Sequence, residues 1–592
     1  MKKETKQCQN CKQNFTLEAD DFLFFEKIKV PAPTFCSDCL FQARLVFRND
    51  RNLYRRKSDN DGTEIISMYS KDKPLKIYAR DYWWSDKWDS LEYGGEYDFN
   101  EPFFEQFKKL ILDVPWPSFF NWNSVNSDFC NFSTDNKNCY LVFGSDFNEN
   151  TSYCKYSFHC KDSSDLYWAD KAELSYENVD CENIYKVLFS AYSDNCASSS
   201  FLYNCSNCQN CLGCVNLKNK SYCIFNEQYT KEEYEKKIKE FNLNNYPDLE
   251  EFKKRFEKFR TGFPNRFARI IRSVNCTGNN IFNSKSCLIC FDVHDNSEDC
   301  KNVFLAGWNA KDIYFSSHVG YQTELVYNSI GVFSGAQNVK CSAYVPTCTR
   351  VSYSYNCKSS SYLFGCAGLK NKQYCVLNKQ YTKEEYEVLL PKIIKHMDDM
   401  PYADKKSRVY KYGDFFPAEL SPFGYNETEA HEYAPLTEED AKNSGFSWKD
   451  SEERNYSVTK RTEDLSGKIS DAPDSMPAEV IACAHDGKCN EQCTSAFKIT
   501  KSEFDFYRRM DIPLPRLCPN CRHYARLLKR NPYKLWHRKC QCAGVKSENG
   551  AYQNTAAHQH AAEHCPNEFE TSYALGRPEI VYCETCYNSE VV

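Results

Sequence analysis

The chain has 592 residues, of which 41% are hydrophobic and 15% aromatic, so it has material for several buried cores and more than one domain. Its formal net charge of −6 argues against a chain coated in basic charge for nucleic acid, although a local basic patch stays open. The charged first residues are followed by no apolar run, and no stretch reaches 18 apolar residues, so we expect neither a secretory leader nor a membrane partner.

The 34 cysteines divide into three sets, at residues 8–39, 130–375 and 483–586. In a small secreted domain they would indicate disulfides, but this chain is large and its outer cysteines have metal-ligand spacing. The sequence therefore predicts a cytoplasmic protein whose thiols either bind zinc or are buried as small apolar groups.

The first cysteine set predicts a zinc-ribbon-like module over residues 1–58. Cys8 and Cys11 form one Cys-x2-Cys knuckle, and Cys36 and Cys39 form a second. Each knuckle presents two thiolates at one corner of a tetrahedron, so the two together supply all four ligands of a structural zinc ion. A closed set of this kind leaves no open position for catalysis.

Residues 59–123 are rich in Trp, Tyr and Phe, as in Tyr82-Trp83-Trp84. We predict a packed connector here; the alternative is an exposed aromatic platform for bases or sugars.

The middle of the chain predicts a parallel β-solenoid in two similar halves. Many cysteines between Cys130 and Cys223 are separated by multiples of three, those from Cys348 to Cys375 step by nine, and Asn often precedes them. Such regularity is typical of stacked coils, where small residues fill inner corners and Asn forms ladders or takes the left-handed turn. Separations of 15 recur, and we expect coils of roughly 15 to 24 residues.

Each half ends in a helix. Residues 217–235 and 369–387 repeat at an offset of 152 without a gap, and Thr230 with Glu233, like Thr382 with Glu385, has capping-box spacing. The sequence predicts a helix over 230–260 and a shorter one over 383–400. The resulting segments are solenoid half 1 at 124–228, a helical segment at 229–262, solenoid half 2 at 263–381, and a helix and linker at 382–475.

Residues 476–539 repeat the first module. At an offset of 482, residues 11–57 align with 493–539 without a gap, so that Cys11, Cys36 and Cys39 meet Cys493, Cys518 and Cys521. The first knuckle has one extra residue, and we predict its ligand to be Cys489. The second zinc site is thus predicted to be Cys489, Cys493, Cys518 and Cys521.

A degenerate third module is predicted over residues 540–592. Cys565, Cys583 and Cys586 occupy the positions of three ligands, but the position of the first is Ala562. The fourth ligand must come from Cys540, Cys542, His558, His560 or His564, and we favour Cys542 or His564. Alternatively, the spare ligands form a further site, including a catalytic zinc with three protein ligands and a water.

A basic segment follows the closing knuckle of the first two modules. Arg44 and Arg48 meet Arg526 and Arg530 at the offset of 482, and their spacing places them on one helical face. These are candidate nucleic-acid contacts. The alternatives are that they offset the negative charge of four thiolates, or that the face is simply solvated.

Two enzyme-like readings remain as alternatives. The run Cys205, Cys208, Cys211 and Cys214 is similar to an iron–sulfur motif, but its last gap is two residues and Val215 replaces the usual Pro, so stacked buried thiols are favoured. A β-helix acting on polysaccharides would need convergent carboxylates, for which Asp162, Asp165, Asp180 and Asp194 are candidates.

The two-knuckle pattern with its Phe-x-Phe pair, proline-flanked second knuckle and basic segment resembles the zinc-ribbon, treble-clef-like domains of bacteria. Together with Trp83-Trp84-Ser85-Asp86-Lys87-Trp88 and the repeated middle, nearly the whole chain resembles a family of uncharacterised bacterial zinc-ribbon proteins without an established activity. The sequence thus predicts a mainly β scaffold with two Zn²⁺ sites and room for a third, which binds nucleic acid or another protein. It does not determine the oligomeric state.

Overall fold

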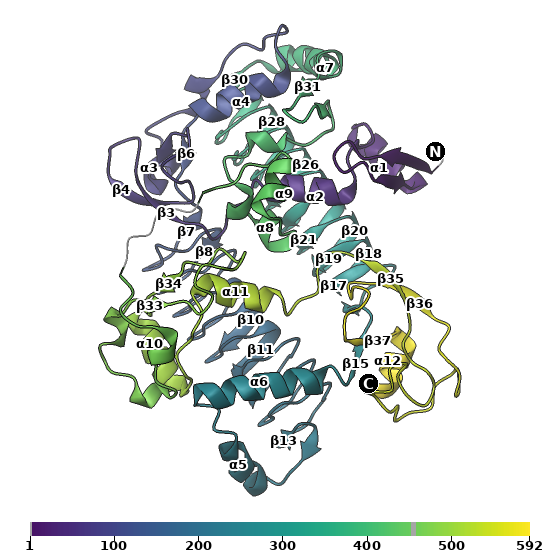
Figure 1. Cartoon of the computed structure of the whole chain (residues 1–592). Helices are drawn as coiled ribbons and strands as arrows, with labels where there is room; N and C mark the ends of the chain where they lie inside the picture. The colour runs from purple at the N-terminus through teal and green to yellow at the C-terminus, as the bar shows by residue number, and fades with distance from the viewer. Residues whose placement is uncertain (1–2, 451–456, 592) are drawn as a thin grey trace. The chain divides into compact units, whose positions relative to one another are not determined.

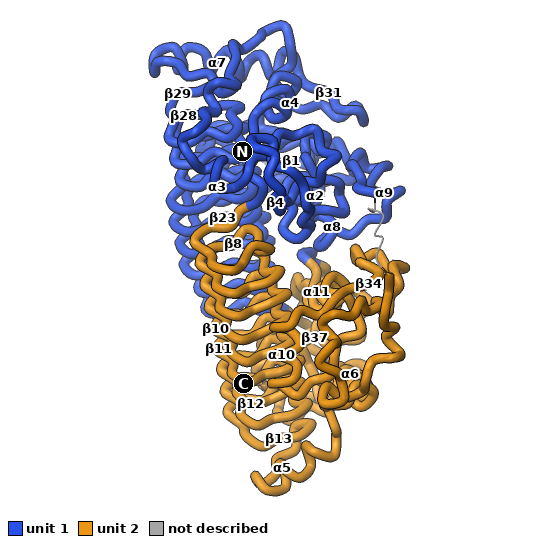
Figure 2. Tube along the Cα trace, turned by 90° about the vertical axis from the view of Figure 1, so that its left-hand side faces the viewer, with its two compact units in different colours: residues 1–119, 268–450, 533–535 blue, residues 120–267, 451–532, 536–592 orange. Residues whose placement is uncertain are grey.

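The computed structural model describes residues 3–450 and 457–591, which form two compact units (Figure 2). Unit 1 comprises residues 1–119, 268–450 and 533–535, and unit 2 comprises residues 120–267, 451–532 and 536–592. The N-terminal cysteine module therefore folds with the second half of the solenoid, and the two C-terminal modules fold with the first half. The predicted linker over 382–475 includes residues 451–456, which lie outside the described residues, as do 1–2 and 592.

The solenoid of unit 2 has coils of 12 residues, the separation between stacked side chains such as Asn136 and Asn148. Tyr167 pairs in parallel with Lys155 on one side and with Val179 on the other, and most bridges outside the strands keep this step. The longest sheet of this solenoid contains β9 (Lys155–Phe158), β10 (Tyr167–Glu173), β11 (Val179–Leu188) and β12 (Ala197–Ser200). The predicted mainly β, parallel solenoid is confirmed, whereas the coil length predicted from the cysteine spacing is wrong, because the coils are shorter.

A left-handed residue at nearly every third position turns the chain around each coil. Asn138, Asn195 and Asn204, for example, have φ between 53° and 54°, a region that Asn tolerates better than most residues. The next residue in each case, such as Cys139, is buried in the interior of the coil. Each coil of unit 2 thus has four short sides, and one residue of each side faces the core.

Polar residues at inner positions complete the hydrogen bonding between coils. The hydroxyl of Ser145 donates to the carbonyl of Phe143 at 2.8 Å and accepts the backbone N–H of Ser157 at 2.9 Å, one coil further on. Cysteines at inner positions have the carbonyls two residues before and nine residues ahead within reach, as Cys205 has those of Tyr203 at 3.6 Å and Cys214 at 3.4 Å. Small residues with one donor therefore suit these corners, because a buried backbone group without a partner is costly.

The solenoid of unit 1, some of whose strands are labelled in Figure 1, changes its coil length along the chain. The step is 13 residues from Lys285 to Glu298 and is repeated in the next three coils, whereas it is 12 residues from Ser342 to Ser354 and in the coils that follow. One sheet consists of β18 (Lys285–Leu288), β20 (Glu298–Lys301), β22 (Lys311–Tyr314), β24 (Glu324–Tyr327), β26 (Gln337–Lys340), β27 (Thr349–Ser352), β28 (Ser361–Phe364), β29 (Gln373–Val376) and β30 (Lys379–Gln380). A second sheet consists of β16 (Ile270–Ile271), β17 (Gly278–Phe282), β19 (Cys290–Val293), β21 (Phe304–Gly307), β23 (Ser317–Gly320) and β25 (Ile330–Phe333).

Helices follow both solenoid halves, and both predicted capping boxes are present. The helix predicted over 230–260 is divided into α5 (Lys231–Glu240) and α6 (Tyr246–Arg260), because Asn242 takes a left-handed conformation and Pro247 starts a new first turn. The second helix, α7 (Lys383–Asp399), agrees with the prediction over 383–400, and because the first is divided, α7 is longer than either of its parts. Within the described residues, none of the helices combines the length and the apolar character that crossing a membrane requires.

The aromatic connector packs against the unit 1 solenoid. Trp83 is fully buried, and α4 (Phe103–Asp113) turns Phe103, Phe104 and Phe107 into the interior. Phe103 contacts the ring of Phe364 edge-on at 5.3 Å. These four aromatic side chains of the connector are packed in the interior, whereas Trp84 and Trp88 are half-buried.

Candidate metal centres

Within the described part of the chain, three groups of four cysteines bring their sulfur atoms within 4.8 Å of one another. The first is the predicted set, Cys8, Cys11, Cys36 and Cys39, in unit 1. Cys8 follows the strand β1 (Glu4–Gln7), and its hairpin partner β2 (Asn14–Leu17) follows Cys11. Cys36 and Cys39 lie at the start of α2 (Ser37–Leu45).

The second group differs from the prediction by one ligand. It contains Cys483, Cys493, Cys518 and Cys521, so Cys483 takes the place that the sequence assigned to Cys489. The reason is an enlarged first knuckle, which separates Cys483 from Cys493 by nine residues. Cys489 lies within this loop, with its Sγ 3.7 Å from that of Cys521.

The third group is completed by Cys540, which joins Cys565, Cys583 and Cys586. The preferred fourth ligands, Cys542 and His564, are not part of it. His564 places Nδ1 3.1 Å from the carbonyl oxygen of Cys565 and Nε2 4.0 Å from Glu548. Here the first knuckle is far longer still, so the sequence offset could not locate its first ligand.

All three modules have the same local design. The backbone N–H of the third cysteine donates to the sulfur of the first, from Cys36 to Cys8 at 3.3 Å, and the equivalent bonds are Cys518 to Cys483 at 3.3 Å and Cys583 to Cys540 at 3.2 Å. The third cysteine directly precedes a helix, α2, α11 (Pro519–Leu527) or α12 (Glu584–Val591), and the fourth is its third residue. The positive end of each helix therefore faces the thiolates and offsets part of their charge.

The sulfur spacing fits a tetrahedral ion. Four sulfur ligands at about 2.3 Å from zinc lie about 3.8 Å apart. The Sγ–Sγ distances are 3.6 Å for Cys11–Cys36, 4.0 Å for Cys493–Cys518 and 3.9 Å for Cys565–Cys583. In each group, hydrogen bonds between thiols lower the pKa of one member, with the largest contribution from Cys36 to Cys8, from Cys483 to Cys518 and from Cys540 to Cys583. The same hydrogen bonds raise the pKa of the partner thiols Cys36, Cys521 and Cys586, so within each group one thiol is set apart as the most readily ionised.

Two further groups share a cysteine with these sites. Cys542, His558 and His560 surround Cys586, and His485, Cys489 and Glu491 surround Cys521. Cys586 and Cys521 are the equivalent fourth cysteines of their modules. Both extra groups come from the enlarged first knuckles, and the first module, whose knuckle has only two intervening residues, has no such loop.

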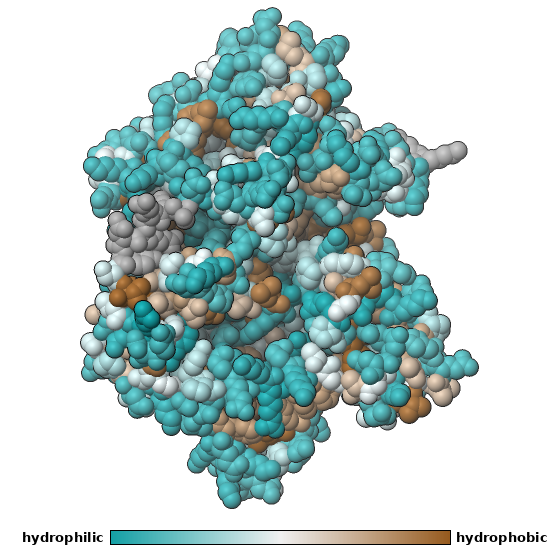
Figure 3. Space-filling model, in the orientation of Figure 1, coloured by the Kyte–Doolittle hydropathy of each residue, from teal (hydrophilic) through white to brown (hydrophobic). Residues whose placement is uncertain are grey.

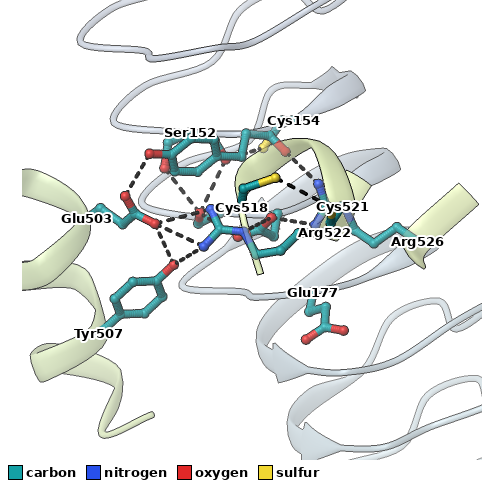
Figure 4. A network of polar contacts seen from close by, with 12 residues as sticks. Ser152, Cys154, Glu177, Glu503, Tyr507, Cys518, Cys521, Arg522 and Arg526 are labelled. Atoms are coloured by element: carbon teal, nitrogen blue, oxygen red, sulfur yellow. Dashed lines mark hydrogen bonds and ion pairs between the residues drawn. The ribbon is translucent and has the colours of Figure 1, made fainter. Parts of the chain in front are cut away.

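The basic segment of the second module faces the unit 2 solenoid. Arg526 in α11, labelled in Figure 4, forms an ion pair with Asp165 and donates from Nη2 to the carbonyl of Tyr153 at 3.2 Å. Arg522 donates to Glu503 at 3.1 Å and to Tyr507 at 3.0 Å, both in α10 (Lys501–Met510). These arginines thus connect the two helices of the module to the coil beneath them.

The predicted nucleic-acid contacts are buried. The exposed fractions of Arg44, Arg48, Arg526 and Arg530 are 1%, 3%, 1% and 6%. Arg44 donates to Ser317 and Asn328 of the unit 1 solenoid at 3.3 and 3.2 Å, and Arg48 pairs with Asp50 at 2.8 Å. Buried side chains have little surface to offer a phosphate, so their burial does not support the predicted contacts with nucleic acid. Arg44, Arg526 and Arg530 contact solenoid side chains instead, and Arg48 pairs with Asp50 and Glu429.

The geometry gives little support to the two alternatives, an iron–sulfur cluster and polysaccharide cleavage. Cys205, Cys208, Cys211 and Cys214 occupy the four inner positions of one coil, and within the described residues they are not among the groups spaced to hold a metal ion. Of the candidate carboxylates, Asp165 and Asp180 are buried against arginines, and Asp162 lies 3.7 Å from Arg509. Asp165 and Asp180 therefore serve module docking, which argues against a shared role of these acids in polysaccharide cleavage.

On the face that Figure 3 shows, hydrophobic residues lie in small groups among hydrophilic ones. The exposed large hydrophobic residues of the solenoid coils are spread along the chain, as at Val125, Phe147 and Tyr185 in unit 2 and Val274 and Ile289 in unit 1.

Comparisons with known proteins leave the chain without an assigned family. No protein-family model matches it, and no curated protein matches it. Among solved structures, it is similar to a UDP-N-acetylglucosamine acyltransferase from Campylobacter jejuni, with 8% identity over 48% of this chain and 100% of that one. The TM-score of 0.08 is too low for this likeness to support any argument about function.

Proposed function

We propose that this protein is a zinc-dependent scaffold, in which three four-cysteine modules bind structural zinc and hold β-solenoids that present their outer surfaces to a protein partner. The observation that carries the proposal is the closed ligand set: each module supplies four thiols and leaves no coordination position for a substrate. Zinc fits this donor set because it prefers tetrahedral thiolate coordination and has no redox chemistry of its own.

The first two modules pack against the solenoids through buried side-chain contacts. Arg44 in unit 1 and Arg526 in unit 2 are equivalent residues, and both end in contacts with solenoid side chains. Metal binding would thereby contribute to the stability of each unit, because the ligands are brought together only when the module is folded. We infer that loss of zinc weakens the docking of the modules as well as the modules themselves.

Protein is the favoured partner class. The chain has a net charge of −6, and the four arginines best placed for phosphate are buried in ion pairs or polar contacts. Nucleic-acid binding depends on exposed basic surface and produces a steep salt dependence. A solenoid instead offers an extended surface built from repeated coils, which suits contact with another folded chain.

Metal analysis of the full chain tests the structural part. We expect at least three zinc ions per chain by elemental analysis, and loss of tertiary structure by near-UV circular dichroism after a strong chelator. Cys518→Ser should remove one ion, because Cys518 belongs to a four-cysteine group. The matched control is Cys357→Ser, another buried thiol, at an inner solenoid position of the kind that serine also fills; it should keep the full content.

Binding measurements test the partner class. Fluorescence anisotropy measures binding of labelled duplex DNA and single-stranded RNA at salt concentrations from about 50 to about 200 mM. We expect no salt-dependent binding of either nucleic acid over this range. An affinity for nucleic acid that falls steeply with salt would indicate that the partner is nucleic acid and not protein. Protein without zinc, or with iron and acid-labile sulfide, would refute the scaffold proposal itself.

A further inference from the structure

We propose that the C-terminal module binds two metal ions that share the thiolate of Cys586. This inference rests on the proposed zinc sites and extends them by a second ion, bound by Cys542, His558, His560 and Cys586. The four ligand atoms lie within 4.8 Å of one another, and Cys586 belongs equally to the group of Cys540, Cys565 and Cys583. A thiolate has enough lone pairs to bridge two ions, and His₂Cys₂ is a common zinc donor set.

The two histidines are oriented as metal ligands. His558 places Nε2 2.8 Å from Oε1 of Glu590, and His560 places Nδ1 2.7 Å from the carbonyl oxygen of Glu563. In metal sites the ring nitrogen that does not bind the ion usually donates to a carboxylate or a carbonyl, which fixes the tautomer. The remaining nitrogen of each ring is then unprotonated and available as a ligand, and Nε2 of His560 is 3.3 Å from Sγ of Cys586.

The surrounding groups hold these ligands in place. The side chain of Glu590 is fully buried and accepts the backbone N–H of Thr555 at 2.8 Å and that of Ala556 at 3.2 Å. Asn554 donates to the sulfur of Cys542 at 3.2 Å and accepts from the hydroxyl of Tyr582 at 2.8 Å. Metal sites use such hydrogen bonds to fix the geometry of their ligands. Here they come both from the long knuckle, through Asn554, and from the C-terminal helix, through Glu590.

Charge also favours a second ion. One divalent ion with four thiolates leaves a buried excess of negative charge. Adding a second divalent ion with one further thiolate, that of Cys542, and two neutral imidazoles brings the cluster one charge unit closer to neutrality. Cys540, Cys542 and Cys565 are all buried, so water screens this charge poorly.

The second ion has a structural role in the long first knuckle. Between β35 (Trp536–Lys539) and β36 (Glu568–Thr571), the chain forms no helix and only isolated bridges, at Cys542–Ser547 and Lys546–Gln553. The three extra ligands all come from this segment. Module 2 repeats the relationship, since its enlarged knuckle brings His485, Cys489 and Glu491 to Cys521, the equivalent of Cys586.

Zinc counting on the full chain, by elemental analysis and native mass spectrometry, tests the proposal. The double variant H558A/H560A should hold one ion fewer than the wild type, and Cys586→Ser should hold two fewer, because it removes a ligand from both sites. His564→Ala is the matched control: it lies in the same segment, outside every ligand group, and should keep the wild-type content.

An unchanged content in H558A/H560A would overturn the second ion while leaving the four-cysteine sites intact. A wild type without zinc would instead refute the proposed function. If the double variant loses two ions because the module unfolds, His560→Cys decides the matter, since a thiolate can replace the imidazole as a ligand. Wild-type content in His560→Cys supports the shared site, and loss of zinc there overturns it.

Discussion

Arg530 of the second cysteine module places Nε 2.6 Å from Oδ2 of Asp180 in the solenoid, and the two side chains are 4% and 7% exposed. Its guanidinium also lies over the ring of Tyr167, at 5.4 Å from the centroid. A charge removed from water in this way is stable only with its partner, because desolvation costs several kcal/mol per ion. The pair therefore ties the position of the module to one coil of the solenoid.

Replacing Arg530 with Met should destabilise unit 2 by about 3–5 kcal/mol, because Asp180 is left buried without its cation. Chemical denaturation followed by circular dichroism measures the change. Arg509→Met is the control, since Arg509 is half-exposed and 3.7 Å from Asp162, and it should cost less than about 1 kcal/mol. Equal effects of the two substitutions would show that Arg530 does not anchor the module.

In the second metal centre, substitutions can test whether Cys483 or Cys489 is the metal ligand. Cys483→Ser should lower the zinc content by one ion and open residues 476–532 to limited proteolysis, because Cys483 is one of the four ligands. Cys489→Ser should leave the wild-type cleavage pattern, since Cys489 is outside that group. The reverse result would restore Cys489 as the ligand that the sequence indicated.

The solenoid was predictable because its inner corners accept small residues and its turns favour Asn. The coil length was not, because cysteine occupies only some inner positions and Ser, Val or Leu fills the others. The separation of nine residues between Cys205 and Cys214 is one coil of 12 residues less one side of three residues. The separation of 15 residues between Cys139 and Cys154 is one coil plus one side. Counting serines at the same three-residue step would have revealed the period.

The metal centres show a similar limit. Spacing located the ligands wherever the knuckle was short, but the loops before Cys493 and Cys565 move the first ligand to Cys483 and Cys540 by lengths that sequence alone does not constrain. The basic segments were misjudged because helical spacing places Arg526 and Arg530 on one face without telling what that face contacts. Their partners, Asp165 and Asp180, are 361 and 350 residues away in the chain.

The asparagine ladder of unit 2 predicts a second stability effect. Asn126, Asn138, Asn150 and Asp162 stand one coil apart, and Asn138 accepts from Asn126 and donates to Asn150, both at 3.1 Å. Asn138→Ala should cost about 1–2 kcal/mol, because alanine is strained at the left-handed φ of 53°.

Asn138→Gly should recover most of that loss, since glycine adopts this conformation freely, and what remains measures the ladder. Lys137→Ala, at the preceding exposed position, removes only a surface ion pair with Glu149 and should change the unfolding midpoint little. If Ala and Gly at position 138 are equally destabilising, backbone strain is not the cause.

Asp414, buried beside the first module, predicts a pH-dependent stability. Burial raises its pKa to about 6, against the N–H of Lys411 and the hydroxyl of Thr34, which hydrogen-bond to the carboxylate. The unfolded chain titrates this group near 3.9, so between these values the folded chain binds more protons and its free energy of unfolding falls as the pH rises. The Asp414→Asn variant has no carboxyl group at this position and therefore lacks this fall in stability.

The stability of the wild type relative to Asp414→Asn should therefore decrease by about 1 kcal/mol between pH 5 and pH 7.5, as thermal unfolding at a series of pH values measures. Acid release of metal affects both chains and cancels in the difference. A relative stability that rises with pH would mean that Asp414 is stabilised as a carboxylate.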